Sequence, residues 1–179
     1  MSKAQDLIKE DEQYFAKSGR IKYYPLAIDH GYGATLVDVD GKEYIDLLAS
    51  ASSQNVGHAP KKVTEAIKKQ VDKFVHYTPA YMYHEPLIRL SKKICDISPG
   101  DYEKRVTYGL SGSDANDGII KFARAYTGRP YIISFTNAYH GSTFGSLSMS
   151  AISLNMRKKY GPLLNGFYHI PLSLIHISE

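Results

Sequence analysis

The chain has 179 residues, of which 43% are hydrophobic and 22% are charged, so it can bury the core of about one soluble domain. Its net charge is +4, but many of its lysines lie in pairs on helix-like segments, a pattern typical of solvated helix faces and not of a nucleic-acid footprint. No apolar run is long enough for a membrane span or a secretory signal, and the single cysteine, Cys95, excludes an internal disulfide framework, so we expect a cytoplasmic protein.

The N-terminal part of the chain predicts a surface helix followed by a β-hairpin. Sparse apolar positions up to about Arg20 indicate an exposed helix, which we expect to end at Ser18–Gly19, where glycine suits a helix C-cap. Asp40-Gly41 then separates two strand-like runs, residues 34–39 and 42–47. Asp-Gly in a two-residue hairpin turn places both residues at positive φ, and this is the turn that we expect here.

Two amphipathic helices are expected after residues 49–58, which are small and polar and predict a loop. The first helix begins after Pro60, and the second is stopped by Pro99-Gly100. The apolar stripes consist of Val63, Ala66, Ile67, Val71 and Phe74 in the first helix and of Leu87, Leu90, Ile94 and Ile97 in the second. The aromatic segment between the helices, residues 76–83, either packs in the interior or lines a pocket.

A strand, a helix and a second strand are expected in the last third of the chain. Residues 105–108 form a strand-like run, a helix begins at Ser111 and ends at Gly128, and residues 131–135 form the next strand. Strand, helix and strand with short joints make a βαβ unit, which has parallel strands and a right-handed crossover. The predicted fold class is therefore α/β.

Residues 109–113, between the first of these strands and the helix, are a candidate anion site. Ligands of open α/β sheets bind at the carboxyl ends of strands, and the free N–H groups and the dipole of a helix N-terminus attract anions. Gly112 would let a phosphate approach the backbone closely, and Ser113 adds a hydroxyl donor. The alternative is an ordinary helix N-cap, because Ser and Asp are common capping residues.

Residues 137–142 follow the next strand and are expected to face the same crevice. The ring of Tyr139 can lie flat on a planar ligand there, and His140 can donate a hydrogen bond or tune a nearby proton. The alternative is a buried tyrosine with a satisfied hydroxyl. We expect no metal site, because His84-Glu85 lacks the second histidine of a zinc helix, and no serine-hydrolase chemistry, because the nucleophile-elbow motif is absent.

Four segments taken together resemble one known family. They are DVDGKEYID at residues 38–46, Gly57-His58 followed by Pro60, SGSDAN at residues 111–116 and YHGS at residues 139–142. Their order and spacing, over about residues 20–171, are similar to the N-terminal part of class III (4-aminobutyrate-type) aminotransferases. Within that family, the amino-acid sequence is especially similar to that of the isoleucine 2-epimerases.

The resemblance implies a partial fold type I transferase that depends on pyridoxal 5'-phosphate (PLP) and is a homodimer when full-length. Residues 1–59 would contribute to the small domain, and residues 60–171 would form the first part of the PLP-binding large domain. Residues 172–179, LSLIHISE, depart from the family pattern. This tail resembles a translated sequencing adaptor, so we expect it to be non-native.

The resemblance also implies roles for single residues. Gly112 and Ser113 would hold the PLP phosphate, Tyr139 would stack on the pyridine ring, and His140 would lie beside it. Residues 50–58 and 77–83 would approach the substrate. The family's Schiff-base lysine lies beyond the last residue of this chain, so no catalytic residue is assigned, and the chain alone is expected to be inactive.

The implied activity of the full-length protein is a PLP-dependent transformation of an amino-acid substrate. Transamination is the first alternative, and epimerisation by an amino-acid racemase is the second; both begin with loss of the Cα proton while PLP acts as electron sink. Two hypotheses of other classes stay open. The chain could be a non-catalytic module that binds a phosphate ligand at Gly112 and Ser113, or a truncated product without function.

Overall fold

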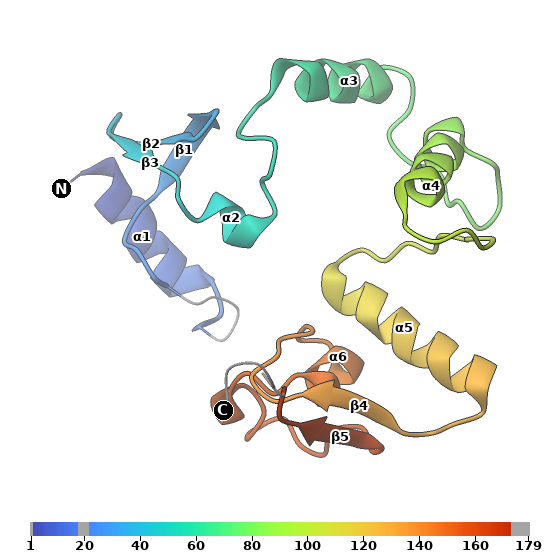
Figure 1. Ribbon diagram of the computed structural model, residues 1–179. Coiled ribbons are helices and arrows are strands. Elements are labelled where there is room, and N and C mark those ends of the chain that lie inside the picture. Colours follow the sequence, from blue (N-terminus) through green and yellow to red (C-terminus); the bar gives the residue numbers. More distant parts are fainter. Residues whose placement is uncertain (1, 18–21, 173–179) are drawn as a thin grey trace, which may run out of the picture. The chain divides into compact units, whose positions relative to one another are not determined.

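A computed structural model describes residues 2–17 and 22–172 (Figure 1). The chain forms two compact units, Met1–Met82 and Tyr83–Glu179. The first unit contains a three-stranded antiparallel sheet, and the second contains a two-stranded parallel sheet, so the α/β prediction is confirmed. In the described part of the chain, no helix combines the length and the apolar character needed to span a membrane.

The first unit begins with helix α1, Lys3–Tyr14, in which no residue is buried, so the predicted surface helix is confirmed. A capping box fixes its start: the Ser2 hydroxyl accepts from the Gln5 N–H, and the Ser2 N–H donates to the Gln5 side chain. The helix ends earlier than predicted, because Phe15 adopts extended backbone. The predicted stop at Ser18–Gly19 lies outside the described residues.

The sheet of the first unit consists of β1 (Ile28–Tyr32), β2 (Thr35–Asp38) and β3 (Glu43–Ile45), in the order β1-β2-β3. The predicted hairpin is the β2–β3 pair and is confirmed. The predicted turn type is wrong, because Gly41 has a φ of 85° while Asp40 does not have a positive φ.

The observed turn is a three-residue loop that ends in a glycine bulge. The Gly41 N–H donates to the Asp38 carbonyl at 2.9 Å, and the Asp38 N–H donates to the Lys42 carbonyl at 3.0 Å. The buried Asp38 carboxylate also accepts the N–H groups of Asp40 and Lys42. These contacts to one side chain favour the longer turn over the two-residue turn.

The predicted loop at residues 49–58 contains one short helical turn, α2 (Ala49–Ser52), and the two predicted amphipathic helices follow as α3 (Lys61–Val71) and α4 (Glu85–Ile97). Both helices are confirmed, and Ser98 ends α4 just before the predicted Pro99-Gly100 stop. No residue of α3 or α4 is buried; the apolar stripe of α3 is exposed, and in α4 Leu90 and Ile97 are exposed while Leu87 and Ile94 are half-buried.

The second unit contains the predicted helix as α5 (Gly112–Thr127), with Ser111 as N-cap and Gly128, at a φ of 67°, as C-cap. The predicted second strand is also confirmed as β4 (Ile132–Phe135). The predicted strand at residues 105–108 is wrong. A strand exists only where a partner binds its N–H and C=O groups, and no strand among the described residues pairs with this segment.

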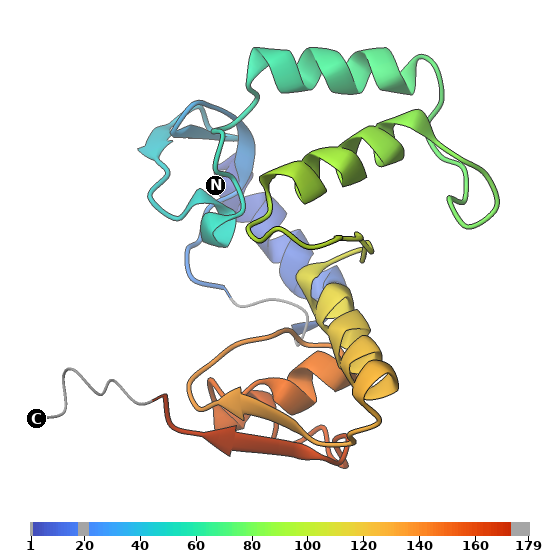
Figure 2. The ribbon, with the colours of Figure 1, turned by 45° about the vertical axis from the view of Figure 1, so that its right-hand side comes forward.

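The parallel pair of the second unit is formed by β4 and the strand that follows it in the chain, and not by residues 105–108 and β4 as predicted. Strand β4 pairs with β5 (Phe167–Ile170) in a register that places Ile132 opposite Phe167. The connection between them contains helix α6 (Phe144–Met149) and the short 3₁₀ helix η2 (Leu154–Met156). Figure 2 shows α6 beside the two strands, which it contacts.

The core of the second unit lies around α6, which is buried from Gly145 to Met149. Among the described residues, the buried apolar side chains of this unit are Ile120 on α5 and Leu147 and Met149 on α6, and α5 and α6 pack against each other. Serine hydroxyls in this core are paired: the Ser150 hydroxyl, for example, donates to the Ser146 carbonyl at 2.8 Å. This packing fixes the segment before α6 against the start of α5.

Candidate functional site

The N-terminus of α5 is the candidate anion site, and Ser111 caps it. The Ser111 hydroxyl accepts from the Asp114 N–H at 3.2 Å, and the Asp114 carboxylate accepts from the Leu110 N–H at 2.9 Å. The N–H groups of Gly112 and Ser113 belong to the first turn of the helix and have no intrahelical acceptor. A Cβ on Gly112 would meet no atom within 4 Å outside its own turn of the helix, so open space lies at this position beside Gly112.

Ser113 connects the start of α5 to the segment before α6. Its hydroxyl oxygen accepts from the Ser142 N–H at 3.1 Å, which leaves the hydroxyl hydrogen free to be donated. Gly141 lies directly against it: a Cβ there would stand 2.5 Å from the Ser113 oxygen and would also collide with Ser146. Since Gly141 has a φ of 134°, only glycine allows this close approach without strain.

Two further side chains of α5 hold this segment and the first turn of α6. The Asn116 amide donates to the His140 carbonyl at 2.6 Å, and the Asp117 carboxylate accepts from the Ser146 N–H at 2.6 Å. Together with Ser113 they occupy positions i, i+3 and i+4, which share one face of a helix. Sequence reasoning gave Asn116 and Asp117 no role, although their spacing from Ser113 is visible in SGSDAND.

Tyr139 and His140 lie on the segment that α5 holds. Tyr139 is 54% exposed, and its hydroxyl pairs with the Ser142 hydroxyl at 3.0 Å, so the alternative of a buried tyrosine is wrong. The backbone N–H of His140 donates to the Ser150 hydroxyl at 2.9 Å. Its ring Nε2 is buried and has no hydrogen-bond partner within the described ranges.

The structure therefore links Ser113 to Tyr139 through a single residue, Ser142, and holds His140 from the same helix. Such a site can bind an anionic group at the α5 N-terminus and a planar ring at Tyr139. Open space at Gly112, a free hydroxyl hydrogen on Ser113 and an unpartnered ring nitrogen on His140 all fit a cofactor with a phosphate and an aromatic ring. The roles of these residues stay predictions.

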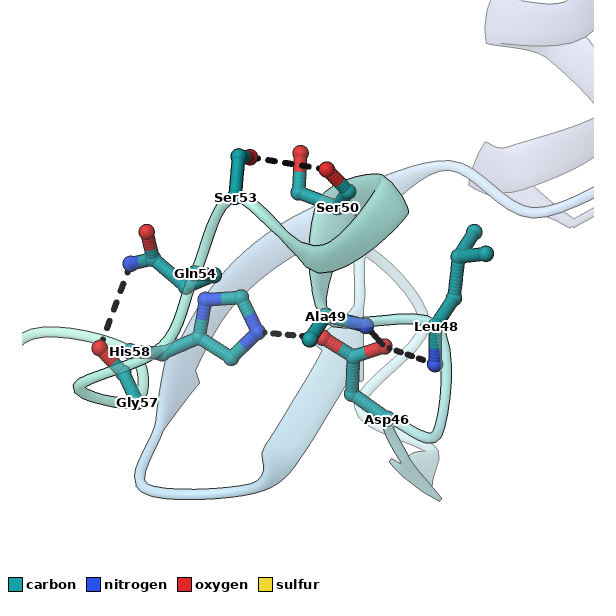
Figure 3. A network of polar contacts seen from close by, with 8 residues as sticks. All are labelled: Asp46, Leu48, Ala49, Ser50, Ser53, Gln54, Gly57 and His58. Carbon is teal, nitrogen blue, oxygen red and sulfur yellow. Dashed lines mark hydrogen bonds and ion pairs between the residues drawn. The ribbon is translucent and has the colours of Figure 1, made fainter. Parts of the chain in front are cut away.

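A second polar network lies in the first unit, around the segment that follows β3 (Figure 3). His58 Nε2 lies 2.7 Å from Asp46 Oδ2, and the side chains are 20% and 7% exposed, respectively. Asp46 Oδ1 accepts the N–H groups of Leu48 and Ala49 at 3.0 and 2.8 Å. The hydrogen bonds from His58 and then from Ala49 lower the pKa of Asp46, so the carboxylate form is favoured.

Comparison with known proteins identifies relatives of two kinds. Isoleucine 2-epimerase of Lentilactobacillus buchneri is 58% identical over 171 residues, which are 96% of this chain and 38% of that protein. Leucine/methionine racemase of Thermococcus litoralis is 41% identical and covers 92% of this chain and 37% of its own length. A probable 4-aminobutyrate aminotransferase of Bacillus subtilis is 36% identical over 79% of this chain and 32% of that protein.

Comparison with solved structures also identifies aminotransferases as relatives. Taurine:2-oxoglutarate aminotransferase from Bifidobacterium kashiwanohense, in complex with PLP and glutamate, superposes with a TM-score of 0.85 at 30% identity, over 98% of this chain and 40% of that one. The predicted fold type I architecture is therefore confirmed, in part of its length. The profile of the family "Aminotransferase class-III" matches residues 16–179. The chain thus spans about two fifths of its relatives' length and belongs to the class III aminotransferase family.

Proposed function

We propose that the full-length protein is a PLP-dependent enzyme acting on amino acids and that this chain supplies the phosphate end of its cofactor site. The contact between Ser113 and Ser142 carries this proposal, because it places the tyrosine-bearing segment on the N-terminus of α5. Family membership supports the interpretation of this contact as part of a cofactor site, since relatives in the family include a structure in complex with PLP.

Each predicted residue has a distinct task in this proposal. Gly112 and Ser113 bind the phosphate through their N–H groups and the Ser113 hydroxyl. Tyr139 holds the plane of the pyridine ring, and His140 offers Nε2 as a hydrogen-bond partner. When bound, PLP supplies an electron sink for the charge that develops at Cα of an amino acid.

The proposal assigns no catalytic residue to this chain, because the Schiff-base lysine would lie in the part of the full-length protein that follows. We expect the 179-residue chain by itself to be inactive and the full-length protein to be a cytoplasmic homodimer. The predicted domain boundary between residues 59 and 60 belongs to the same proposal. The non-native tail also stays a prediction, since only Leu172 of residues 172–179 lies in the described part.

Similarity favours epimerisation over transamination as the outcome of the reaction. The relatives that are epimerases or racemases are 58%, 41% and 37% identical, whereas the aminotransferases among the relatives are 32–38% identical. The two reactions differ in where the Cα proton returns. Transamination returns it to the cofactor carbon, whereas epimerisation returns it to Cα from the opposite face.

The experiment that tests the proposal starts by resequencing the source gene across codons 165–185, and then expresses the full-length protein. We expect an absorbing cofactor that borohydride reduction attaches covalently to the protein. Conversion of L-isoleucine without an added 2-oxoacid would identify an epimerase, whereas conversion of isoleucine or 4-aminobutyrate only with a 2-oxoacid would identify a transaminase. A phosphate ligand that binds reversibly and is never attached would instead favour the non-catalytic module.

A further inference from the structure

Helix α2 is a left-handed turn made entirely of non-glycine residues. Ala49, Ser50, Ala51 and Ser52 have φ angles of 47°, 51°, 53° and 66°. In L-residues this conformation brings Cβ too close to the following carbonyl oxygen, and residues other than Gly, Asn and Asp rarely adopt it. Four such residues in succession persist only where surrounding contacts hold them.

Asp46 supplies the contacts at the entrance of the turn. Its Oδ1 atom accepts from the N–H groups of both Leu48, the residue before the left-handed segment, and Ala49, the first residue of that segment. Its Oδ2 atom is held by His58 Nε2 at 2.7 Å (Figure 3). Both carboxylate oxygens are therefore used, one on the turn and one on the histidine.

The residues after the turn close it from the other side. The Gln54 N–H donates to the Ala49 carbonyl at 2.9 Å, and the Gln54 side chain donates to the Gly57 carbonyl at 3.2 Å. The Ser53 hydroxyl donates to the Ser50 carbonyl at 2.7 Å. These bonds connect the turn to the backbone just before His58.

His58 is in turn fixed to the sheet of the first unit. Its N–H donates to the Gly33 carbonyl at 2.8 Å, and its carbonyl accepts from the Gly33 N–H at 3.1 Å. The ring packs on Gly31, where an added Cβ would lie 3.0 Å from the ring carbon Cγ. Asp46 is also tied to the sheet, because its N–H donates to the Ala34 carbonyl. The sheet thus positions both members of the pair.

We propose that Asp46 and His58 are positioning residues that clamp the turn Ala49–Ser52 in its left-handed form and hold its exposed surface ready for the amino-acid substrate. The turn is suited to this task because Ser50, Ala51 and Ser52 are exposed and carry small side chains that let a ligand approach the backbone. The contact with substrate rests on the proposed function, whereas the clamp itself rests on the geometry above.

The clamp is tested in the 179-residue chain by NMR. In H58L we expect hydrogen exchange at the Leu48 and Ala49 amides to accelerate about tenfold or more, since a charge-assisted hydrogen bond is lost. The couplings that report positive φ at residues 49–52 should move toward ordinary values. H58Q keeps an N–H donor near the position of Nε2 and should restore most of the protection.

A matched control is available in the same sheet. His30 and Asp29 also form a 2.8 Å pair, but both side chains are more than half exposed, and H30L should leave the Leu48 and Ala49 amides unchanged. Unchanged exchange in H58L, or negative φ at residues 49–52 in the unsubstituted chain, would overturn the clamp.

The role toward substrate is tested in the full-length PLP-loaded protein. We expect H58L to raise KM for the amino acid about tenfold while kcat and cofactor content stay close to those of the unsubstituted protein, and H58Q to restore KM. A full-length protein that retains no PLP would overturn the proposed function, and the exchange rates would still decide the clamp. A PLP-loaded H58L protein with unchanged KM would overturn the positioning role alone.

Discussion

The two units each hold an irregular segment in place, but by different means. In the second unit, the segment before α6 has a φ of 134° at Gly141. Two side chains of α5 hold this segment, and a third holds the first turn of α6. In the first unit, the turn Ala49–Ser52 contains no glycine, and contacts from Asp46 hold it. Where glycine removes the strain, contacts only place the segment; where alanine and serine bear the strain, contacts must also preserve its conformation.

The largest effect is expected from adding a Cβ where the glycine segment meets α5. We expect G141A to lower the free energy of unfolding by about 2–4 kcal/mol, because the new Cβ would collide with Ser113 and Ser146 and because alanine disfavours a φ of 134°. Urea unfolding of the chain measures the loss. G112A, whose Cβ would meet open space, serves as the control. Equal unfolding midpoints for both variants would contradict this reading of the contact.

A smaller loss is expected from removing the acceptor that α5 offers to α6. In D117A the N–H of the fully buried Ser146 would lose its 2.6 Å bond, which costs about 1–3 kcal/mol. D117N keeps an oxygen acceptor and should lose clearly less. Thermal unfolding can separate the two, since each kcal/mol shifts Tm by about 2–4 °C at this size. If D117N unfolds as early as D117A, the carboxylate charge and not the hydrogen bond is what matters.

We expect the stability that the left-handed turn contributes to depend on pH and not on the volume of a side chain. The hydrogen bonds from His58 and Ala49 lower the pKa of Asp46 in the folded chain. A lowered pKa contributes stability above the unfolded value of about 3.9, and this contribution disappears as pH falls through the folded pKa. We therefore expect D46N to be less stable than the unsubstituted chain near neutral pH, with a difference that shrinks below about pH 4.

Unfolding midpoints measured from about pH 7 to about pH 2 test this expectation. The pKa of Asp38 is also lowered, mainly by the Lys42 N–H, so acid weakens both chains and only their difference reports on Asp46. D29N, in the exposed pair with His30, is the control and should match the unsubstituted chain throughout. A deficit in D46N that does not change with pH would contradict the assignment.

Local sequence patterns predicted most of the helices and singled out Gly112 and Ser113 at the candidate anion site. Three-and-four spacing located α3 and α4, and Ser111 and Gly128 bounded α5, because caps and apolar periodicity act within one element. The strand at residues 105–108 was mispredicted, since a strand needs a partner that its own residues cannot specify. The short parallel strand β5 and the buried helix α6 were missed for the same reason: they are stabilised by contacts across the unit.

The left-handed turn was beyond prediction for a different reason. Alanine and serine have no preference for positive φ, so the sequence at residues 49–52 indicates only a loop. The conformation depends on Asp46 and on His58, twelve residues further along the chain, and both depend on the sheet. A role for Asn116 and Asp117 could have been predicted, because their spacing from Ser113 places the three residues on one face of a helix. Both residues were nevertheless overlooked.

The smallest effect on stability, and the sharpest test of the anion site, is expected at Gly112. G112A should change the free energy of unfolding by less than about 1 kcal/mol, since its Cβ meets no atom within 4 Å. That Cβ would nevertheless fill the space beside the first N–H groups of α5, so inorganic phosphate should shift the Ser113 amide resonance less than it does in the unsubstituted chain. G118A, further along α5, makes the same substitution away from the N-terminus and should leave the phosphate response intact. Equal responses in all three chains would mean that α5 begins with an ordinary cap, and the cofactor phosphate would have to be bound elsewhere.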